Sequence, residues 1–347
     1  AIITPNVRRA SRPGAFVEVL GLPAVKGRDF VVAMDIGGTK LLVCLLDSRD
    51  RIVAEARIST EAHLGPEAVV DRLVGAMRQV LRDGGVEESH VLGIGISSAG
   101  PSNPARGIIY NSPNLPGWRD IPLVQWVQDK TGLRACLGND ANLAALAEHT
   151  FGAGRGVDNM VYVTVSTGIG GGIVANGKLY IGGVGTAGEI GHAIVRVDGP
   201  QCSCGRRGCL ESFSAGWALA ERARRSVALG EKTLLLDVAG GRAENITAQT
   251  VFEAAARGDM LSRSILDDGA RYLGVGLANL AVLLDPELIV IGGGMSTRWN
   301  DYVGKAVEYV HATEYPLPLK DLRIVPAGLV DKVSIYGALA LARQTFG

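Results

Sequence analysis

One histidine and three cysteines stand close together in the middle of the chain. His192 is followed by Cys202, Cys204 and Cys209, so three of the five cysteines fall within eight residues. An imidazole and three thiolates form a closed tetrahedral set of the kind that zinc takes in structural sites, whereas a catalytic zinc keeps one position open. A disulfide with a spare thiol is the alternative, but Cys202 and Cys204 are too close to bridge easily. We therefore predict a structural zinc site that shapes its surroundings.

Three glycine clusters follow apolar runs that indicate strands. Backbone N–H groups in such loops can approach a phosphate closely, and a carboxylate beside them can hold a metal ion. Glycine pairs at hairpin tips are also ordinary turns, and neither a Rossmann fingerprint nor a P-loop is present. Three such loops at strand ends nevertheless favour nucleotide binding. The candidate residues are Asp35, Gly37, Gly38, Thr39 and Lys40, then Thr167 and Gly168, and finally Gly292, Gly293 and Gly294.

Asp140 follows Asn139 at a predicted strand-to-helix junction. One interpretation is a helix N-cap, a position that Asp and Asn favour. The other is a general base that takes the proton from a substrate hydroxyl as its oxygen attacks phosphorus, while Asn139 binds other hydroxyls. Asn114, Glu189 and His192 supply further donors and acceptors of the kind that a polyol needs, and together they favour the base.

Composition narrows the class of protein. The 347 residues suffice for two domains, and 47% hydrophobic with 20% charged residues is ordinary for a globular protein. Acidic and basic residues balance at 35 each, so no overall field attracts nucleic acid or a membrane surface, and we expect a small-molecule partner. We find no apolar run of about 18 residues and no signal-peptide pattern, so we expect a cytoplasmic protein. Cys44 and Cys136 are expected to be buried, reduced core thiols.

Apolar periodicity indicates an α/β protein. Strands at 30–35 and 41–46 flank the first glycine pair, and strands from 160–166 and through 174 flank a second glycine loop at 167–172, so we predict two glycine-tipped hairpins and an internal duplication. Further strands are predicted at 91–97, through 137 and at 288–291. Helices are predicted at 66–82, between 120 and 132, at 142–150, 215–229, 248–257 and 264–284, and from about 332.

We predict two α/β domains around a cleft. An extension at 1–28 precedes a small domain at 29–138, and a large domain with the zinc loop covers 139–331. A C-terminal helix at about 332–347 is expected to pack back on the small domain.

Six ordered motifs resemble the ROK family of sugar kinases and repressors, and most closely its bacterial glucokinases. The resemblance implies the actin-like and hexokinase-like ATPase fold and extends from Asp35 to about Leu341. The motifs are Asp35 to Lys40, Ser112 to Trp118, Gly138 to Asn142, Thr167 to Gly172, Gly188 to His192 and Cys202 to Glu211.

The resemblance also implies a role for each motif. Asp140 would be the base for the sugar 6-hydroxyl, the phosphates of ATP would lie between loops 37–40 and 167–172, and Asp35 would order Mg²⁺ and its waters. His192 would bind zinc through one ring nitrogen and face the sugar with the other side of the ring. A homodimer is implied. The residues expected to hold the sugar are Gly100, Asn114, Asn139, Asp140, Glu189, His192 and Glu211.

We therefore predict an ATP-dependent hexose 6-kinase that acts on glucose. N-acetylglucosamine, N-acetylmannosamine, mannose and fructose share hydroxyls with glucose and are the alternative substrates. A sugar-responsive transcriptional regulator is the alternative outside the enzymes. The balanced charge, an extension too short for a winged-helix domain and the carboxylate of Asp140 argue against a regulator, and that carboxylate also argues against a purely structural protein.

Overall fold

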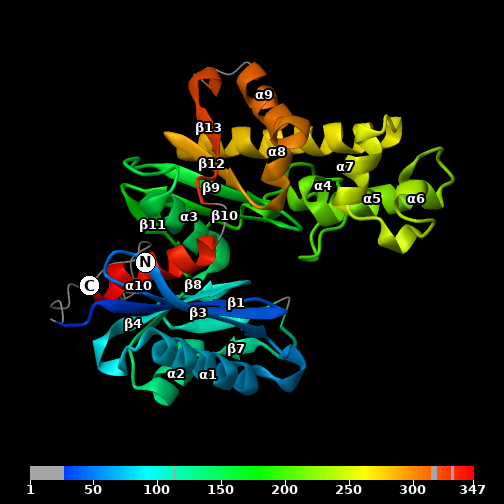
Figure 1. Cartoon of the computed structure of the whole chain (residues 1–347). Helices are drawn as coiled ribbons and strands as arrows, with labels where there is room; N and C mark the ends of the chain where they lie inside the picture. The colour runs from blue at the N-terminus through cyan, green and yellow to red at the C-terminus, as the bar shows by residue number, and fades with distance from the viewer. Residues whose placement is uncertain (1–26, 113–114, 314–318, 330–331) are drawn as a thin grey trace, which may run out of the picture. The chain divides into compact units, whose positions relative to one another are not determined.

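The computed structural model describes residues 27–112, 115–313, 319–329 and 332–347. The chain divides into two compact units, drawn in Figure 1. Unit 1 contains the described part of Ala1–Asn139 together with Lys178–Ala187 and Leu341–Gly347, and unit 2 contains Asp140–Gly177 and Gly188–Ala340. The predicted sugar ligand Asn114 and nearly all of the predicted extension lie outside the described residues. Among the described helices, none is both long and apolar enough to span a membrane.

The main sheet of unit 1 has the strand order β3-β2-β1-β4-β8. β1 and β2 form the predicted antiparallel hairpin, and β4 and β8 run parallel to β1, so these three strands end at the same edge. In Figure 1 the helices α1 and α2 lie on one face of this sheet. The bounds are β1 Phe30–Ile36, β2 Lys40–Leu46, β3 Ile52–Ser59, β4 Val91–Ser98, β8 Ala135–Asn139, α1 Pro66–Gly84 and α2 Leu123–Thr131.

The predicted helix at 66–82 is confirmed by α1, and its sequence explains both its ends and its packing. Pro66 stands at the first helical position, where its missing N–H costs nothing, and Gly85 ends the helix with a positive φ of 64°. Val70, Leu73 and Met77 follow helical spacing and are buried in the core of unit 1.

The remaining elements of unit 1 are short. A small antiparallel sheet has the order β5-β6-β7. The segment Lys178–Ala187 begins with one further strand. The bounds are β5 Ser102–Asn103, β6 Ile108–Asn111, β7 Arg119–Ile121 and β11 Lys178–Tyr180.

Unit 2 repeats the hairpin and the parallel strands of unit 1. β9 and β10 pair antiparallel, β12 pairs parallel with β9, and β13 pairs parallel with β12. The order β10-β9-β12-β13 therefore corresponds to β2-β1-β4-β8 in unit 1, which supports the predicted internal duplication. The bounds are β9 Met160–Val165, β10 Ile169–Ala175, β12 Leu288–Gly292 and β13 Arg323–Pro326.

Helices cover both faces of the sheet in unit 2, as Figure 1 shows for α3 and α8. Val161, Val163 and Val165 alternate along β9 and join Leu273 and Leu277 of α8 in one core. The bounds are α3 Asp140–Phe151, α4 Glu211–Ser214, α5 Gly216–Ala228, α6 Leu235–Val238, α7 Ala248–Ala256, α8 Met260–Leu284, α9 Gly304–Ala312 and α10 Val333–Phe346, whose last residues belong to unit 1.

The second glycine loop is shorter than predicted. We expected a loop over 167–172, but β10 begins at Ile169, so Gly170–Gly172 belong to the strand. The reason is tertiary packing, because a Cβ at Gly172 would lie 2.6 Å from the Cβ of Ala145 in α3. Gly170 and Gly172 thus let α3 approach the strand closely.

The prediction also omits β3. Its exposure alternates strictly along Ile52–Ser59, a pattern that the alternating apolar residues Ile52, Ala54, Ala56 and Ile58 already carry in the sequence.

Candidate active site and metal centre

The first glycine loop is a tight turn between β1 and β2. The Gly37 N–H donates to the Lys40 carbonyl at 3.0 Å, and the Thr60 hydroxyl donates to the Gly37 carbonyl at 2.7 Å. Asp35 is half-buried two residues before the turn, while Thr39 and Lys40 are exposed at its end. The turn thus presents a hydroxyl and an ammonium group beside a carboxylate, a set of groups that suits a phosphate with its metal ion.

Asn139 and Gly100 lie together at one edge of the sheet of unit 1. Asn139 is the last residue of β8, and its side-chain amide donates to the Gly100 carbonyl at 3.2 Å. Ser98, at the end of β4, pairs with Asn139 across the two strands. Two residues predicted to hold the sugar are therefore joined by a hydrogen bond, although they are 39 positions apart in the sequence.

Asp140 is the first residue of α3 and is exposed. Its Oδ1 accepts a hydrogen bond from the Ala141 N–H at 2.8 Å, which ties the side chain to the first turn of the helix. Burial raises the pKa of the nearby Tyr162 to about 12, and the negative charges of Glu148 and Asp140 add to this effect. A helix-terminal role and a role as base are therefore compatible.

The second glycine loop contacts Glu211 directly. The Ile169 N–H donates to Glu211 Oε2 at 2.9 Å, and a Cβ at Gly168 would lie 2.8 Å from the same oxygen. The start of α5 is bonded to this loop as well, because the Trp217 N–H donates to the Thr167 carbonyl at 3.1 Å. Thr167, Gly168 and Glu211 thus form one continuous structure in unit 2.

The third glycine loop lies beside the second. Gly292 pairs with Thr164 at the end of β9, one residue before Val165. Gly293 has φ of 86°, and a Cβ there would lie 2.5 Å from the Val165 carbonyl oxygen, so only glycine fits. Ser166, Thr167 and Gly294 of these two loops line the neighbouring pocket.

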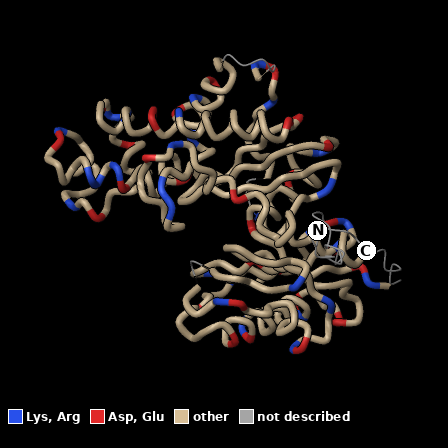
Figure 2. Tube along the Cα trace, turned by 180° about the vertical axis from the view of Figure 1, so that it is seen from behind, with Lys and Arg blue, Asp and Glu red and all other residues tan. Residues whose placement is uncertain are grey.

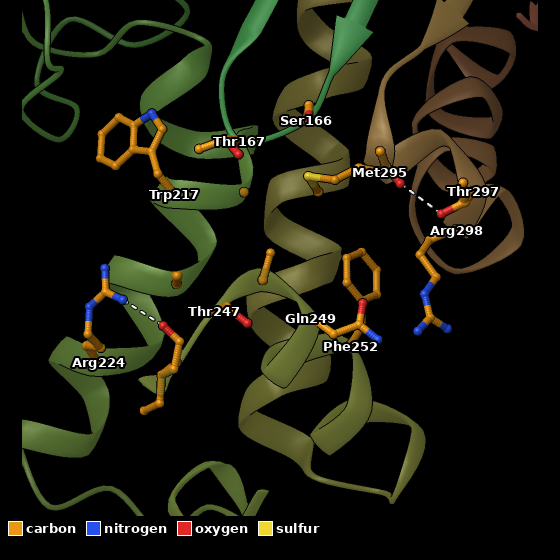
Figure 3. Close-up of a pocket in the computed structure, with 15 residues that line it drawn as sticks. Ser166, Thr167, Trp217, Arg224, Thr247, Gln249, Phe252, Met295, Thr297 and Arg298 are labelled. Carbon is orange, nitrogen blue, oxygen red and sulfur yellow. Dashed lines mark hydrogen bonds between the residues drawn. The ribbon is translucent and has the colours of Figure 1, made fainter. Parts of the chain in front are cut away.

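A cavity of about 440 Å³ opens beside these two loops. Its volume lies in the range of small-molecule sites, which is about 300–1,000 Å³. Figure 3 shows Thr167 and Trp217 on one side and Phe252 with Arg298 on another, and the Arg298 guanidinium lies 5.5 Å from the centre of the Phe252 ring. The lining residues are Ser166, Thr167, Gly216, Trp217, Ala220, Arg224, Ile246, Thr247, Ala248, Gln249, Phe252, Gly294, Met295, Thr297 and Arg298.

The four predicted metal ligands converge in unit 2. The ligand atoms of His192, Cys202, Cys204 and Cys209 all lie within 4.8 Å of one another, with 3.6 Å between the sulfurs of Cys204 and Cys209. Two sulfurs bound to one tetrahedral zinc at about 2.3 Å lie roughly 3.8 Å apart, so this set fits zinc. All five cysteines are free thiols, which disagrees with the disulfide alternative.

Arg206 organises the zinc loop, which we define as residues 192–209. Its guanidinium donates to the His192 carbonyl at 2.9 Å, and its carbonyl accepts from the Cys202 N–H at 2.8 Å. Partial desolvation opposes ionisation of the Cys204 thiol, but hydrogen bonds from Arg206 and the neighbouring cysteines lower its pKa to about 6. The cluster therefore offers a thiolate at neutral pH, which is the form that binds a metal.

Glu189 and Glu211 lie close to the metal ligands. Partial desolvation raises the pKa of the Glu189 carboxyl group, the charge of His192 opposes this shift, and the charge of Glu211 adds to it. Glu211 is buried, and its Oε1 accepts from Trp217 Nε1 at 3.2 Å and from the Ser203 hydroxyl at 3.4 Å. His192 Nδ1 is the ring nitrogen that lies near a thiol, 3.7 Å from Cys202 Sγ.

Comparison with known proteins identifies the family. A model described as the ROK family matches residues 31–345, which is most of the chain. The chain belongs to the ROK family. This match confirms the predicted resemblance, and the relatives and solved structures described next confirm the actin-like and hexokinase-like fold and the predicted enzyme class, a sugar kinase.

Several relatives of this ROK kinase are similar over nearly their whole length. The glucokinase of Thermotoga maritima is 34% identical over 317 residues, which cover 91% of this chain and 98% of that protein. An N-acetylmannosamine kinase of Yersinia pestis is 33% identical over 279 residues, which cover 80% of this chain and 85% of that protein. A ROK family glucokinase from Streptomyces griseus, solved in complex with glucose and AMPPNP, has a TM-score of 0.74 at 33% identity and covers 91% of this chain and 99% of that chain.

The structure of this ROK kinase places the predicted site residues in two groups. Unit 1 holds Asp35, Gly37, Gly38, Thr39, Lys40, Gly100 and Asn139, whereas unit 2 holds Asp140, Thr167, Gly168, Glu189, His192, Glu211, Gly292, Gly293, Gly294 and the cysteine ligands.

Sequence reasoning missed the helical wall of the cavity. Arg224 and Trp217 on α5 and Phe252 on α7 line it, but their spacing is that of ordinary amphipathic helices. The one available signal was the position of Trp217 directly after the zinc motif, six residues beyond Glu211.

Proposed function

We propose that this ROK kinase transfers the γ-phosphoryl group of ATP to the 6-hydroxyl of a hexose, with glucose as the preferred sugar. The observation that carries the proposal is the exposed carboxylate of Asp140 at the start of α3, directly after Asn139, which is hydrogen-bonded to the Gly100 loop. A carboxylate next to a hydroxyl-binding amide is suited to deprotonating one hydroxyl of a polyol while others are held.

The reaction needs one proton acceptor and several positioned donors. The 6-hydroxyl oxygen forms a bond to the γ-phosphorus, the bond from that phosphorus to the ADP oxygen breaks, and the hydroxyl proton passes to the Asp140 carboxylate. Such transfers depend on positioning and on stabilising the charge of the transferred group. The backbone N–H groups of Gly38, Thr39, Thr167 and Gly168 and the Lys40 ammonium would supply that stabilisation.

The 440 Å³ cavity is our proposed site for the adenine and ribose of ATP. Thr167 lines this cavity and also belongs to a predicted phosphate loop, so a nucleotide could extend from the cavity to that loop. The half-buried Asp35 carboxylate suits Mg²⁺, which would neutralise phosphate charge when bound.

The sugar specificity rests on Glu189, His192 and Glu211, which we propose face the 1- and 2-positions. Asn139 and Asp140 would face the 3-, 4- and 6-positions, with Asn114 as a further predicted ligand. A site that pairs a free 2-hydroxyl leaves a buried polar group unsatisfied when that hydroxyl is missing, at a cost of about 1–3 kcal/mol. The glucokinase and N-acetylmannosamine kinase relatives are almost equally similar, so this group of residues is where the two activities would differ.

We propose that one structural zinc ion organises the sugar side. The zinc loop contains no residue predicted to bind the nucleotide, whereas Glu189 and Glu211, predicted to bind the sugar, lie on either side of the zinc-binding residues. A bound zinc ion would hold the ends of this loop together and orient the His192 ring, which is the usual effect of a structural metal on residues around it.

The product identifies the reacting hydroxyl. Incubation with ATP and glucose should yield glucose 6-phosphate and ADP by mass spectrometry and phosphorus NMR, whereas 6-deoxyglucose should yield neither phosphorylated sugar nor excess ADP. Phosphorylation of 6-deoxyglucose would contradict transfer to the 6-position.

As the pH falls, sugar binding is expected to weaken at a higher pH than it would if Glu189 had the pKa of an ordinary glutamate. The raised pKa of Glu189 means that its carboxylate is fully available above that value and is lost as the pH falls through it. The sugar Kd, measured by calorimetry from pH 7 down to about pH 4, should begin to rise at a higher pH in the wild type than in Glu189→Gln. The matched variant Glu231→Gln, on an exposed residue outside the site, should follow the wild type. Identical pH profiles in all three proteins would contradict this role.

Replacing Trp217 by phenylalanine is expected to raise the KM for the sugar about tenfold, with a smaller effect on kcat. The variant keeps an aromatic ring but loses the N–H that holds Glu211 Oε1, while Glu211 Oε2 keeps its bond from Ile169. Steady-state kinetics measure the KM for the sugar and kcat, with Trp126→Phe in α2 as the matched control. An unchanged KM would show that Trp217 does not position Glu211 for the sugar.

A further inference from the structure

A second cavity, of about 830 Å³, lies in unit 2 and is distinct from the proposed nucleotide pocket. The two cavities use different faces of α5. Gly216, Ala220 and Arg224 line the nucleotide pocket at four-residue spacing, whereas Arg222 and Arg225 line the second cavity. The zinc loop and α8 supply the other walls, so we call this space the α5–α8 cavity.

Positive charge dominates the lining of the α5–α8 cavity. Five arginines face three carboxylates, which leaves a formal excess of two positive charges in a chain that is neutral overall. Figure 2 shows Lys and Arg positions along α5 and along the loop that precedes α4. The charged lining residues are Arg196, Arg207, Arg222, Arg225 and Arg271 together with Asp198, Glu221 and Asp268.

The three carboxylates form ion pairs with only some of these five arginines. Asp268 pairs with Arg222 at 2.7 Å and lies 3.9 Å from Arg271. Within the part of the chain that the structure describes, neither Arg207 nor Arg225 makes an ion pair. The two exposed guanidinium groups approach the same cavity from the zinc loop and from α5.

The cavity also has an aromatic wall. The rings of Phe213 and Tyr272 stack with 3.9 Å between their centres and 24° between their planes. The Tyr272 hydroxyl accepts from Arg196 at 3.2 Å, and the Arg271 guanidinium lies 5.3 Å from the centre of the Tyr272 ring. Side chains from three segments thus hold one another in place around an open, positively charged space.

We propose that the α5–α8 cavity binds a small, multiply charged phosphate compound. Guanidinium groups match phosphate oxygens with two parallel hydrogen bonds, and this geometry makes arginine the preferred residue for phosphate recognition. The volume lies in the range of small-molecule sites, about 300–1,000 Å³, and the balanced charge of the whole chain offers no extended basic surface for a nucleic acid. Trp217 of α5 lines both this cavity and the one proposed for ATP, but the other lining residues of the two cavities differ, and so we treat them as two sites.

Calorimetric titration with inorganic tripolyphosphate tests the site on the full chain. The wild type should bind the probe, and Arg207→Gln with Arg225→Gln should weaken binding at least about tenfold, since hydrogen bonds to charged groups are the strong ones. The matched control, Arg242→Gln with Arg257→Gln, removes the same charge from two exposed arginines elsewhere in unit 2 and should stay within about twofold of the wild type. Circular dichroism checks that all variants are folded.

A second double variant, Arg207→Lys with Arg225→Lys, keeps the charge and should bind with intermediate affinity because the planar fork is lost. A probe that bound instead at the loops proposed for ATP would be equally insensitive to both glutamine pairs. Equal affinity in the wild type, the cavity variant and the control would therefore overturn the proposal, as would a wild type that binds no tripolyphosphate at millimolar concentrations.

Discussion

Replacing Asp140 by asparagine is expected to lower kcat about 100- to 10,000-fold, the usual contribution of a general base. The amide cannot accept the proton of the 6-hydroxyl, whereas its Oδ1 can still accept the 2.8 Å hydrogen bond from the Ala141 N–H at the start of α3. The helix N-terminus and the fold should therefore persist. Residual turnover is expected, because positioning by the loops survives.

Steady-state kinetics and sugar binding measured by calorimetry separate the two effects. The sugar Kd of Asp140→Asn should stay within about threefold of the wild type, since the amide can still bind a hydroxyl. Asp237→Asn is the matched control, because Asp237 is an exposed residue of α6 that belongs to no predicted site. Near-normal turnover of Asp140→Asn would leave Asp140 as a helix-terminal residue only.

Replacing Cys204 by serine is expected to reduce the zinc content from one ion per chain to nearly none and to weaken sugar binding about 10- to 100-fold. The hydroxyl is a much poorer zinc ligand than the thiolate, whose formation the surroundings of Cys204 favour. Loss of the ion would release the zinc loop between His192 and Cys209, and with it Glu189 and Glu211, so hydrogen bonds to the sugar would be lost. Binding of ATP should change much less.

Elemental analysis and calorimetry with sugar and with AMPPNP measure these effects. Cys136→Ala is the control, because it removes a thiol of unit 1 and should retain one zinc ion per chain. A wild type that is free of metal yet fully active would contradict the zinc site. Equal losses of sugar and nucleotide affinity in Cys204→Ser would contradict the proposal that the zinc ion supports only the sugar side of the site.

Local sequence patterns predicted the parts of the fold that depend on local chemistry. Apolar runs around short glycine turns predicted both hairpins, and the spacing of Cys202, Cys204 and Cys209 after His192 predicted a cluster that the structure does bring together. Such spacing predicts a metal site well, because a short loop can place its side chains around one point almost independently of the rest of the chain.

Features that depend on tertiary contacts were missed or misplaced. Gly170–Gly172 resembled a loop but belong to β10, because α3 packs closely against Gly170 and Gly172, and Ile190 packs against Gly171. Phe252 and Arg224 line the proposed nucleotide pocket from two helices whose periodicity indicates only a buried face. The hydrogen bond from Asn139 to Gly100 likewise depends on the pairing of β4 with β8. The roles of Asp140 and of the sugar-binding residues, and the homodimer, stay predictions.

A coupled assay of ATP consumption over a panel of hexoses and N-acetylhexosamines tests the proposed activity most directly. We predict ATP-dependent turnover with the highest kcat/KM for glucose, a lower value for mannose, and a value for 2-deoxyglucose reduced roughly 10- to 100-fold and mainly through KM. A higher kcat/KM for N-acetylglucosamine or N-acetylmannosamine would contradict the glucose preference, and no sugar-dependent ATP consumption with any member of the panel would contradict the proposed hexose kinase activity itself.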